Sequence, residues 1–362
     1  MDSLPQEIID EIIDNLPRSS LHSSSLVAKR WRERSQLHVF HTIIFSSECE
    51  ANEWDANIQN GAGGISSYVK RASFYEIPEW SDPALLCRIL ENFTSLTTLW
   101  ISKTEIPDGL PERISDGELS KNLTALYLLS PRCSVSTVIS TIIAFPSLQN
   151  LSIDDFIATS REIPPVYPVL PRRGPLHSLR AVRSEVRVVD ALANLHFASH
   201  HLILDVKAQN MQKLFILSSV TATRLVLYGM CSLCVDCKRI NGEFTDYPDQ
   251  ATSHPIDLAP QFPALASLSI YACGRAPSSH LVNSLVLISS VPALVSITLE
   301  CWHWPPGPLA AWDGLDRRLA QMAKNTTVKG GPVLTLTRWP EKLVPEAFPK
   351  FREVGKVIAG PL

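Results

Sequence analysis

A short apolar pattern recurs along most of this 362-residue chain, and it constrains the fold more than any other feature. The pattern is apolar-x-x-apolar-x-apolar, and its clearest copies have central residues at Leu99, Leu126 and Leu151, with a weaker copy at Leu179. The steps between these residues are 27, 25 and 28 positions. Alternating apolar positions are typical of strands that bury one face. Because one such unit cannot bury its apolar side alone, we expect similar units to stack against each other.

Further copies extend the pattern in both directions. They lie at Ala72 and Phe74, Leu202 and Leu204, Leu225 and Leu227, Leu268 and Ile270, Ile297 and Leu299, and Leu334 and Leu336. Between the copies, segments 83–93, 135–145 and 280–291 carry apolar residues at helical spacing. Strands that alternate with helical connections align in parallel. A leucine-rich chain also matches so short a pattern by chance, but several copies at nearly constant spacing favour an array.

The length and composition of the repeat are similar to those of leucine-rich repeats. This resemblance implies a curved solenoid with a parallel sheet on its concave face. Two insertions rich in proline or turn residues, 161–174 and 241–261, are expected to be surface loops. The predicted fold class is therefore α/β, with the repeats spanning residues 46–344 and a capping helix and tail at 345–362.

The first 45 residues follow a different pattern. Apolar residues between positions 4 and 16 recur at steps of three and four, with acids on the other face, which predicts an amphipathic helix that ends before Pro17. Two more helices are predicted at about 19–27 and 29–40. Three helices of this size bury little apolar surface, so we expect a bundle that leaves apolar surface for a neighbour or a partner.

This segment resembles an F-box over about residues 3 to 44. The residues that carry the resemblance follow in order along the three helices: Leu4, Pro5, Gln6, Glu7, Ile8, Ile9, Ile12, Leu16, Leu21, Leu26, Val27, Lys29, Arg30, Trp31 and Arg32. In that family the module docks onto the Skp-type adaptor of cullin-based SCF ubiquitin ligases, and the rest of the chain captures a substrate. The second helix departs from the family pattern because it is rich in serine, a poor helix former.

The resemblance implies a set of adaptor-binding residues: Leu4, Pro5, Ile8, Ile9, Ile12, Leu16, Leu21, Leu26, Val27 and Trp31. An F-box followed by degenerate repeats also resembles the large F-box families of mushroom-forming fungi. Two alternatives remain open at this point. The helices could simply begin a larger core, or the basic residues around Trp31 could form a nuclear-import or nucleic-acid patch.

The strand residues that alternate with the core leucines are expected to face outward, where a partner would bind. Tyrosine, tryptophan and arginine often dominate binding energy at protein interfaces. The candidate substrate-binding residues chosen on this basis are Tyr75, Trp100, Tyr127, Arg180, Arg224, Tyr228 and Tyr271. The alternative is that tyrosine simply favours strands.

Charge and hydropathy exclude several classes of function. A net charge of -3 offers no field to hold a polyanion, so nucleic acid is not expected as a partner. No stretch of about 18 apolar residues is present, so no membrane span is expected. The opening residues do not form an export signal. We therefore expect a chain in the cytoplasm, the nucleus or both.

Signals for catalysis or metal binding are sparse. Cys231, Cys234 and Cys237 lie at three-residue steps and could hold zinc with His254 or Cys273, but a second Cys-x-x-Cys pair is missing, which favours a reduced loop without metal. Neither a phosphate-binding loop nor a nucleophile elbow occurs. We expect no cofactor and no enzyme activity. The resemblance to an F-box implies a substrate-recognition subunit of an SCF ligase that binds the Skp-type adaptor, its cullin complex and an unknown protein substrate; the alternative is a repeat scaffold unrelated to ubiquitin.

Overall fold

The computed structural model describes residues 4–115, 121–156, 158–159, 174–184, 186–205, 214, 217–229, 261–272, 281–282, 285, 288, 291–301 and 309–360. The chain forms two compact units, Met1–Pro165 and Val166–Leu362. The domain boundaries predicted from the sequence, after residues 45 and 344, stay predictions. The helices of the first 45 residues belong to unit 1 because the strand that follows them, Thr42–Phe45, already pairs with the next strand of that unit.

Unit 1 begins with a three-helix module. Its helices are α1 (Gln6–Asp14), α2 (Arg18–Val27) and α3 (Lys29–Phe40). Ile9, Ile13 and Leu21 form its buried centre, and Leu16, Trp31 and Val39 pack against them. The hydroxyls of Ser24 and Ser35 are buried and bond to each other at 2.8 Å, so α2 and α3 also share a polar contact.

The strands of unit 1 are all parallel and follow one another in sequence order. They are β1 (Thr42–Phe45), β2 (Arg71–Tyr75), β3 (Thr98–Ser102), β4 (Ala125–Leu129) and β5 (Asn150–Asp154). Leu99, Leu126 and Leu151 lie in register and are at most 1% exposed. The sequence pattern therefore predicted both these strands and their buried face correctly, whereas β1 was not predicted.

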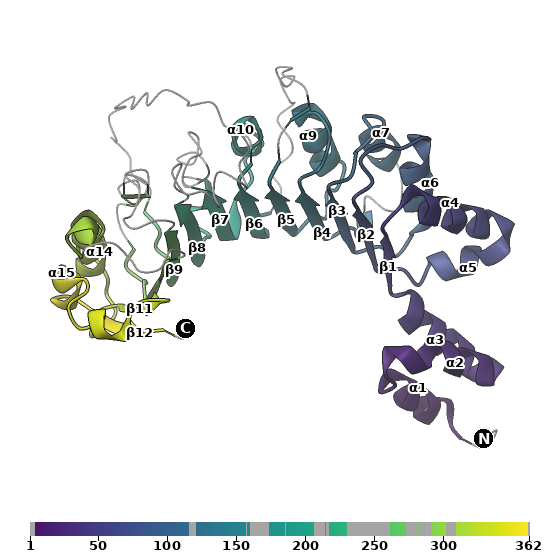
Figure 1. The fold of residues 1–362 in the computed structure, drawn as a ribbon, viewed down its shortest axis with the longest axis horizontal. Helices are drawn as coiled ribbons and strands as arrows, with labels where there is room; N and C mark the ends of the chain where they lie inside the picture. Colours follow the sequence, from purple (N-terminus) through teal and green to yellow (C-terminus); the bar gives the residue numbers. More distant parts are fainter. Residues whose placement is uncertain are drawn as a thin grey trace. The chain divides into compact units, whose positions relative to one another are not determined.

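Helices cover one face of the strands of unit 1 (Figure 1). They are α4 (Glu48–Asn57), the short η1 (Ile58–Ala62) and α5 (Gly63–Ser66), then α6 (Ala84–Asn92), α7 (Leu110–Ser115) and α9 (Val135–Ile143). Helices α6 and α9 occupy segments predicted to be helical. Both bury their apolar faces, as Leu86, Leu90 and Ile139 illustrate with exposures of 0%. The opposite face of these strands points away from the helical layer.

The same backbone turn recurs where the strands end. Glu76, Lys103, Ser130 and Asp155 each directly follow a strand of unit 1 and have positive φ angles between 47° and 56°. The amide of Lys103 still donates to Leu129 of the next strand at 2.8 Å. A left-handed residue thus turns the chain away from the sheet without losing its hydrogen bond. This turn is a structural repeat that the apolar pattern alone does not reveal.

Unit 2 continues the alternation of parallel strands and connections. Its strands are β6 (Leu176–Val182), β7 (Ser199–Asp205), β8 (Arg224–Gly229), β9 (Ser267–Ala272), β10 (Ser296–Cys301), β11 (Val333–Thr337) and β12 (Lys356–Ala359). Each strand pairs with its neighbours in sequence order within the unit. Together the two units contain twelve parallel strands in the described parts of the chain. The prediction of amino-terminal helices followed by a parallel sheet is confirmed.

The helices of unit 2 are α10 (Val186–Asn194), η2 (Leu309–Trp312), α14 (Asp313–Lys324), η3 (Glu341–Leu343) and α15 (Pro349–Arg352). The carboxyl-terminal stretch differs from the expected capping helix. Its helix α15 has only four residues, and β12 then adds a further strand beside β11. The buried carboxylate of Asp316 accepts the amides of Lys350 and Phe351 at 3.0 and 2.9 Å, which fixes α15 against α14.

Most of the predicted insertions at 161–174 and 241–261 fall outside the described residues, and so does much of segment 280–291. Among the helices that are described, none combines the length and hydropathy needed to cross a membrane.

Candidate functional site

The helical module exposes a group of large apolar side chains. Leu4, Ile8 and Ile12 are 36%, 42% and 38% exposed. Ile8 and Ile12 are four residues apart and so share one side of α1, and Leu4 lies just before that helix. Leu26 and Val27, at the end of α2, are 76% and 58% exposed. Together with the exposed Pro5, these residues form what we call the apolar docking face. Exposed apolar groups of this kind mark interaction sites.

The other four predicted adaptor-binding residues lie deeper in the module. Ile9 and Leu21 are 1% and 5% exposed and belong to its buried centre. Leu16 and Trp31 are partly buried and pack against that centre. These four side chains therefore stabilise the packing of the helices. The apolar docking face consists of the six exposed residues.

Ionic contacts fix α1 against α3. The Asp14 carboxylate accepts Arg34 at 2.6 Å and contacts His38 at 2.7 Å. The hydrogen bonds from Arg34 and then His38 hold the pKa of Asp14 well below its usual range. Arg30 of α3 donates to the carbonyl of Leu4 at 2.9 Å and so secures the segment that precedes α1. These exposed contacts supplement the apolar packing that holds α1, which carries Ile8 and Ile12 of the apolar docking face, against α3.

A second candidate surface lies on the outward side of the strands in unit 1. Trp100 of β3 is 37% exposed and stacks on Tyr127 of β4, with ring centroids 4.0 Å apart and planes tilted by 14°. The two residues are paired in register across the parallel strands. Tyr75, also half-buried, lies at the end of β2. The predicted outward placement of these three aromatic residues agrees with the structure.

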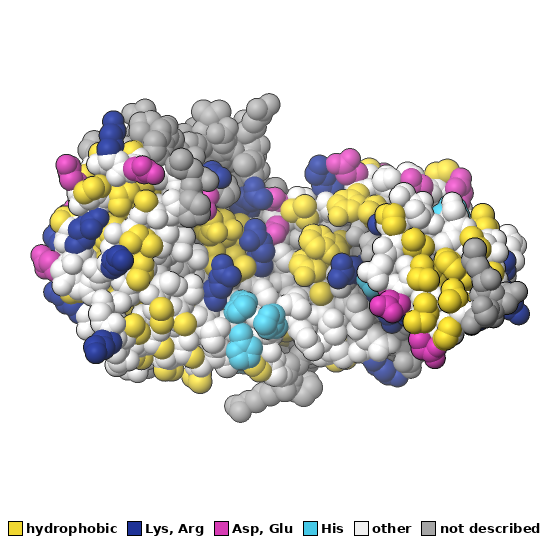
Figure 2. Space-filling view, turned by 90° about the horizontal axis from the view of Figure 1, so that it is seen from below, with side chains coloured by type: hydrophobic (Ala, Val, Ile, Leu, Met, Phe, Trp, Pro, Cys, Tyr) yellow, Lys and Arg dark blue, Asp and Glu magenta, His cyan; other side chains and the backbone are white. Residues whose placement is uncertain are grey.

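The corresponding strands of unit 2 present a different group of side chains. Tyr228 of β8 stacks on Tyr271 of β9 at 4.6 Å, and Arg180 of β6 lies 5.4 Å from the Tyr228 ring. Arg180 also donates to the Tyr228 hydroxyl at 3.3 Å. Arg224, at the start of β8, is exposed. Figure 2 shows histidine side chains next to Lys and Arg side chains, and the rings of His177 and His201 lie 4.8 Å apart. His177 was not among the predicted binding residues.

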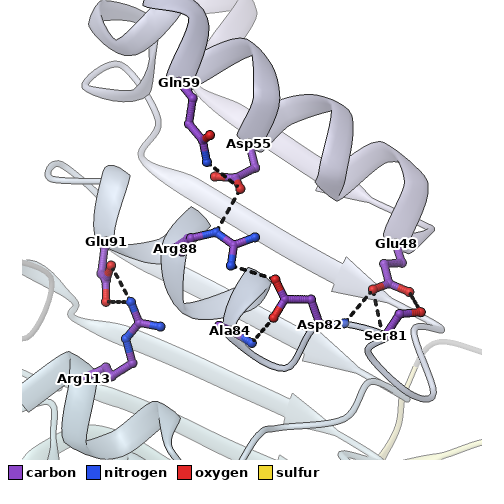
Figure 3. A network of polar contacts seen from close by, with 9 residues as sticks. All are labelled: Glu48, Asp55, Gln59, Ser81, Asp82, Ala84, Arg88, Glu91 and Arg113. Carbon is purple, nitrogen blue, oxygen red and sulfur yellow. Dashed lines mark hydrogen bonds and ion pairs between the residues drawn. The ribbon is translucent and has the colours of Figure 1, made fainter.

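The helical side of unit 1 holds a polar network that the sequence did not suggest. Arg88 of α6 donates to Asp55 of α4 at 3.0 Å and to Asp82 at 2.7 Å (Figure 3). Glu48 of α4 accepts the amide and hydroxyl of Ser81 at 2.8 and 2.9 Å. These contacts join elements about thirty residues apart. They fasten α4 to α6 and leave the outward face of the strands untouched.

The described residues offer no group of three or more His, Cys, Asp or Glu side chains that could hold a metal ion. Cys231, Cys234, Cys237, His254 and Cys273 lie outside those residues, so the possible zinc site remains a sequence-based alternative. The surfaces that the described residues do present are suited to binding partners.

Residues 1–42 match the F-box domain family. The match covers the whole three-helix module and agrees with the resemblance drawn from the sequence. No curated protein matches the chain. The chain therefore carries an F-box domain at its amino-terminal end.

Proposed function

We propose that this chain is a substrate-recognition subunit of an SCF-type E3 ubiquitin ligase. Its F-box domain binds the Skp-type adaptor, which links it to the cullin, and the strands that follow bind a protein substrate. The chain contributes recognition, and ubiquitin transfer takes place on other subunits, so no catalytic residue is assigned to it. It acts in the cytoplasm, the nucleus or both, where such ligases work.

One observation carries this proposal: the apolar docking face is exposed on a module that matches the F-box domain. Ile8 and Ile12 cannot reach the buried centre, because Ile9 and Ile13 occupy it from the other side of α1. Leaving such side chains in water is unfavourable by roughly 25 cal/mol for each Å² of apolar surface. A partner that covers them recovers this free energy, and an adaptor with an apolar groove is such a partner.

The substrate-binding part of the proposal rests on the strand faces. The strand, turn and helix units are degenerate leucine-rich repeats stacked as a solenoid, an assignment supported by the near-constant spacing of Leu99, Leu126 and Leu151 and by their shared register. The helices occupy one side of the strands in unit 1, so the opposite side is available to a substrate. The stacked pair of Trp100 and Tyr127 is the strongest candidate for an anchor there, since tryptophan and tyrosine are enriched among hot spots.

Co-expression with a Skp-type adaptor tests the proposal. We expect the two proteins to copurify, and we expect Ile8→Glu combined with Leu26→Glu to weaken adaptor binding at least about thirtyfold, as the loss of a hot spot does. Val295→Glu is the matched control, because Val295 is 51% exposed but lies in unit 2. The proposal is overturned if the wild-type chain does not bind the adaptor, or if the wild type, the double variant and the Val295→Glu control bind it equally. Either result would favour a scaffold unrelated to ubiquitin.

A further inference from the structure

Four side chains that can carry positive charge gather on three adjacent strands of unit 2. His177 and Arg180 belong to β6, His201 to β7 and Arg224 to β8. His201 and Arg224 are paired in register, and the rings of His177 and His201 lie 4.8 Å apart. His177 and Arg224 are exposed, and the other two are partly buried. We call this group the basic strand face.

The basic strand face differs in charge from the chain as a whole, whose net charge is -3. Burial, followed by the nearby His177, Arg224 and His200, lowers the pKa of His201 below its ordinary value. Each of those neighbours is a cation when protonated, so the site disfavours further positive charge and favours an anion. Arg224 forms no ion pair with any other residue that the structure describes. Glu300 of β10 is paired with Arg338 at 3.3 Å.

We propose that the basic strand face binds an acidic segment of a protein substrate, one rich in aspartate and glutamate. This inference deepens the proposed function, because it names the class of substrate that the strands would capture. Guanidinium groups bind carboxylates through paired, charge-assisted hydrogen bonds. Tyr228 and Tyr271 extend the surface beside Arg180 with stacked rings that can pack against the apolar part of the same segment.

The geometry suits a peptide that crosses the strands. Neighbouring strands lie about 4.8 Å apart, so β6 and β8 are separated by about 10 Å. In a peptide in the polyproline II conformation, which has three residues per turn, carboxylates three residues apart lie on the same side and are separated by about 9 Å. A segment with acids at that spacing therefore reaches cations on both outer strands at once.

Nucleic acid is a poorer fit to the same face. Tight binding of a nucleic acid backbone generally uses several phosphate contacts, about 6 to 10 in well-studied proteins. The basic strand face supplies two arginines and two histidines. An acidic peptide needs fewer contacts and can use the tyrosine pair as well.

The test measures binding of fluorescent peptides to the full chain, copurified with the adaptor. The acidic probe is a peptide of about ten residues, about 31 Å long in the polyproline II conformation, with glutamate at every third position. One comparison peptide has lysine in place of glutamate, and another has phosphoserine. A single-stranded RNA of similar length is the fourth probe. We expect the acidic peptide to bind at least about tenfold more tightly than the lysine peptide, and Arg224→Glu to weaken its binding about tenfold.

Arg71→Glu is the matched control. Arg71 is exposed at the start of β2, in the position that Arg224 holds in β8, and its replacement changes the net charge equally. The proposal is overturned if Arg71→Glu and Arg224→Glu weaken binding equally, or if the acidic peptide does not bind. Preference for the phosphoserine peptide would overturn the choice of carboxylate as ligand, and displacement of the acidic peptide by RNA would overturn the choice of a protein partner. Copurification of the adaptor reports on the proposed function separately.

A pH series adds an independent readout. The pKa of His201 is lowered in the free chain, and a bound carboxylate favours its protonated form, so binding should tighten as pH falls from about 8 to about 6 and weaken as it rises again. The ionisable residues of the same strands are Arg180 on β6, His200 and Asp205 on β7, and Arg224 and Tyr228 on β8. Replacing both His177 and His201 by glutamine should remove the pH dependence while Arg224 still supports binding. A pH profile unchanged by that double replacement would contradict the part assigned to the histidines.

Discussion

Arg88 offers a demanding test of how unit 1 is held together. Its guanidinium joins α4 to the segment around α6 by donating to Asp55 and Asp82. The Asp55 side chain is 7% exposed, and one of its oxygens accepts both Arg88 and Gln59 at 3.0 Å. Its other oxygen is buried and has no hydrogen-bond partner. Arg88→Met would therefore leave a buried carboxylate with a single neutral donor.

The expected cost follows from the burial of the two partners. Removing one member of a fully buried ion pair destabilises a protein by about 3 to 5 kcal/mol. The Arg88 side chain is 34% exposed, so water can partly replace it, and we expect a smaller loss of about 2 to 3 kcal/mol. For a unit of this size, that free energy corresponds to a decrease of about 4 to 12 °C in Tm. Adding Asp55→Asn should recover at least half of the loss, because the buried charge is then gone.

Thermal unfolding, combined with hydrogen exchange of α4 and α6, checks this reasoning. Asp82→Asn is the matched control, because it removes the exposed end of the same network and should change the Tm little. The reasoning is refuted if Arg88→Met lowers the Tm no more than Asp82→Asn does. It is also refuted if Asp55→Asn adds to the loss instead of reducing it.

Three further predictions concern other parts of the chain. Leu126→Ala should destabilise unit 1 by about 2 to 5 kcal/mol in denaturant unfolding, because Leu126 is 0% exposed in the middle of the core row, whereas a loss below 1 kcal/mol would contradict its central position. Asp14→Asn should weaken the α1–α3 contact by at most about 1 kcal/mol above pH 4. Because the folded pKa of Asp14 is lowered, the difference from wild type should shrink as pH falls below the ordinary value of about 3.9 and disappear only as pH falls through the lowered folded pKa; a pH-independent difference would exclude the ion pair as its cause. Trp100→Ala with Tyr127→Ala should weaken capture of a cognate substrate at least about thirtyfold while Tm changes little, and unchanged capture would remove this pair from the binding surface.

The strands were predictable because their signal is periodic. Each residue pair identified from the apolar pattern, from Ala72 and Phe74 to Leu334 and Leu336, lies in a strand of the structure. Strands β1 and β12 were missed for different reasons. The resemblance of the first 44 residues to a helical module concealed β1, and β12 has a single buried apolar residue, Val357, which is too little for a pattern.

A longer form of the repeat was also present in the sequence. In three copies of the pattern, a buried phenylalanine lies three residues before the first leucine, and its carbonyl accepts the amide of that leucine at 3.1 to 3.3 Å. These phenylalanines are Phe93, Phe145 and Phe262. Proline follows two of these phenylalanines, in the same place as Pro292 after Val291. Including this position would have strengthened the assignment of the repeats.

The binding surfaces were only partly predictable. Alternation along a strand correctly placed Trp100 and Tyr127 outward, but it could not show that their rings stack, because that depends on register. The helical periodicity of α1 identified an apolar face without separating the exposed Ile8 from the buried Ile9. The network around Arg88 was not predicted because Asp55, which pairs with Arg88, and Glu48, which accepts from Ser81, belong to a different helix, α4. No periodic pattern relates side chains so far apart in sequence.

Hydrogen–deuterium exchange of the chain with and without the Skp-type adaptor tests the central claim most directly. The claim is that the adaptor covers the apolar docking face. We predict that adaptor binding slows exchange in peptides spanning residues 4–14 and 24–30 and leaves exchange in unit 2 unchanged. A stable complex in which those two segments exchange as fast as in the free chain would contradict the account.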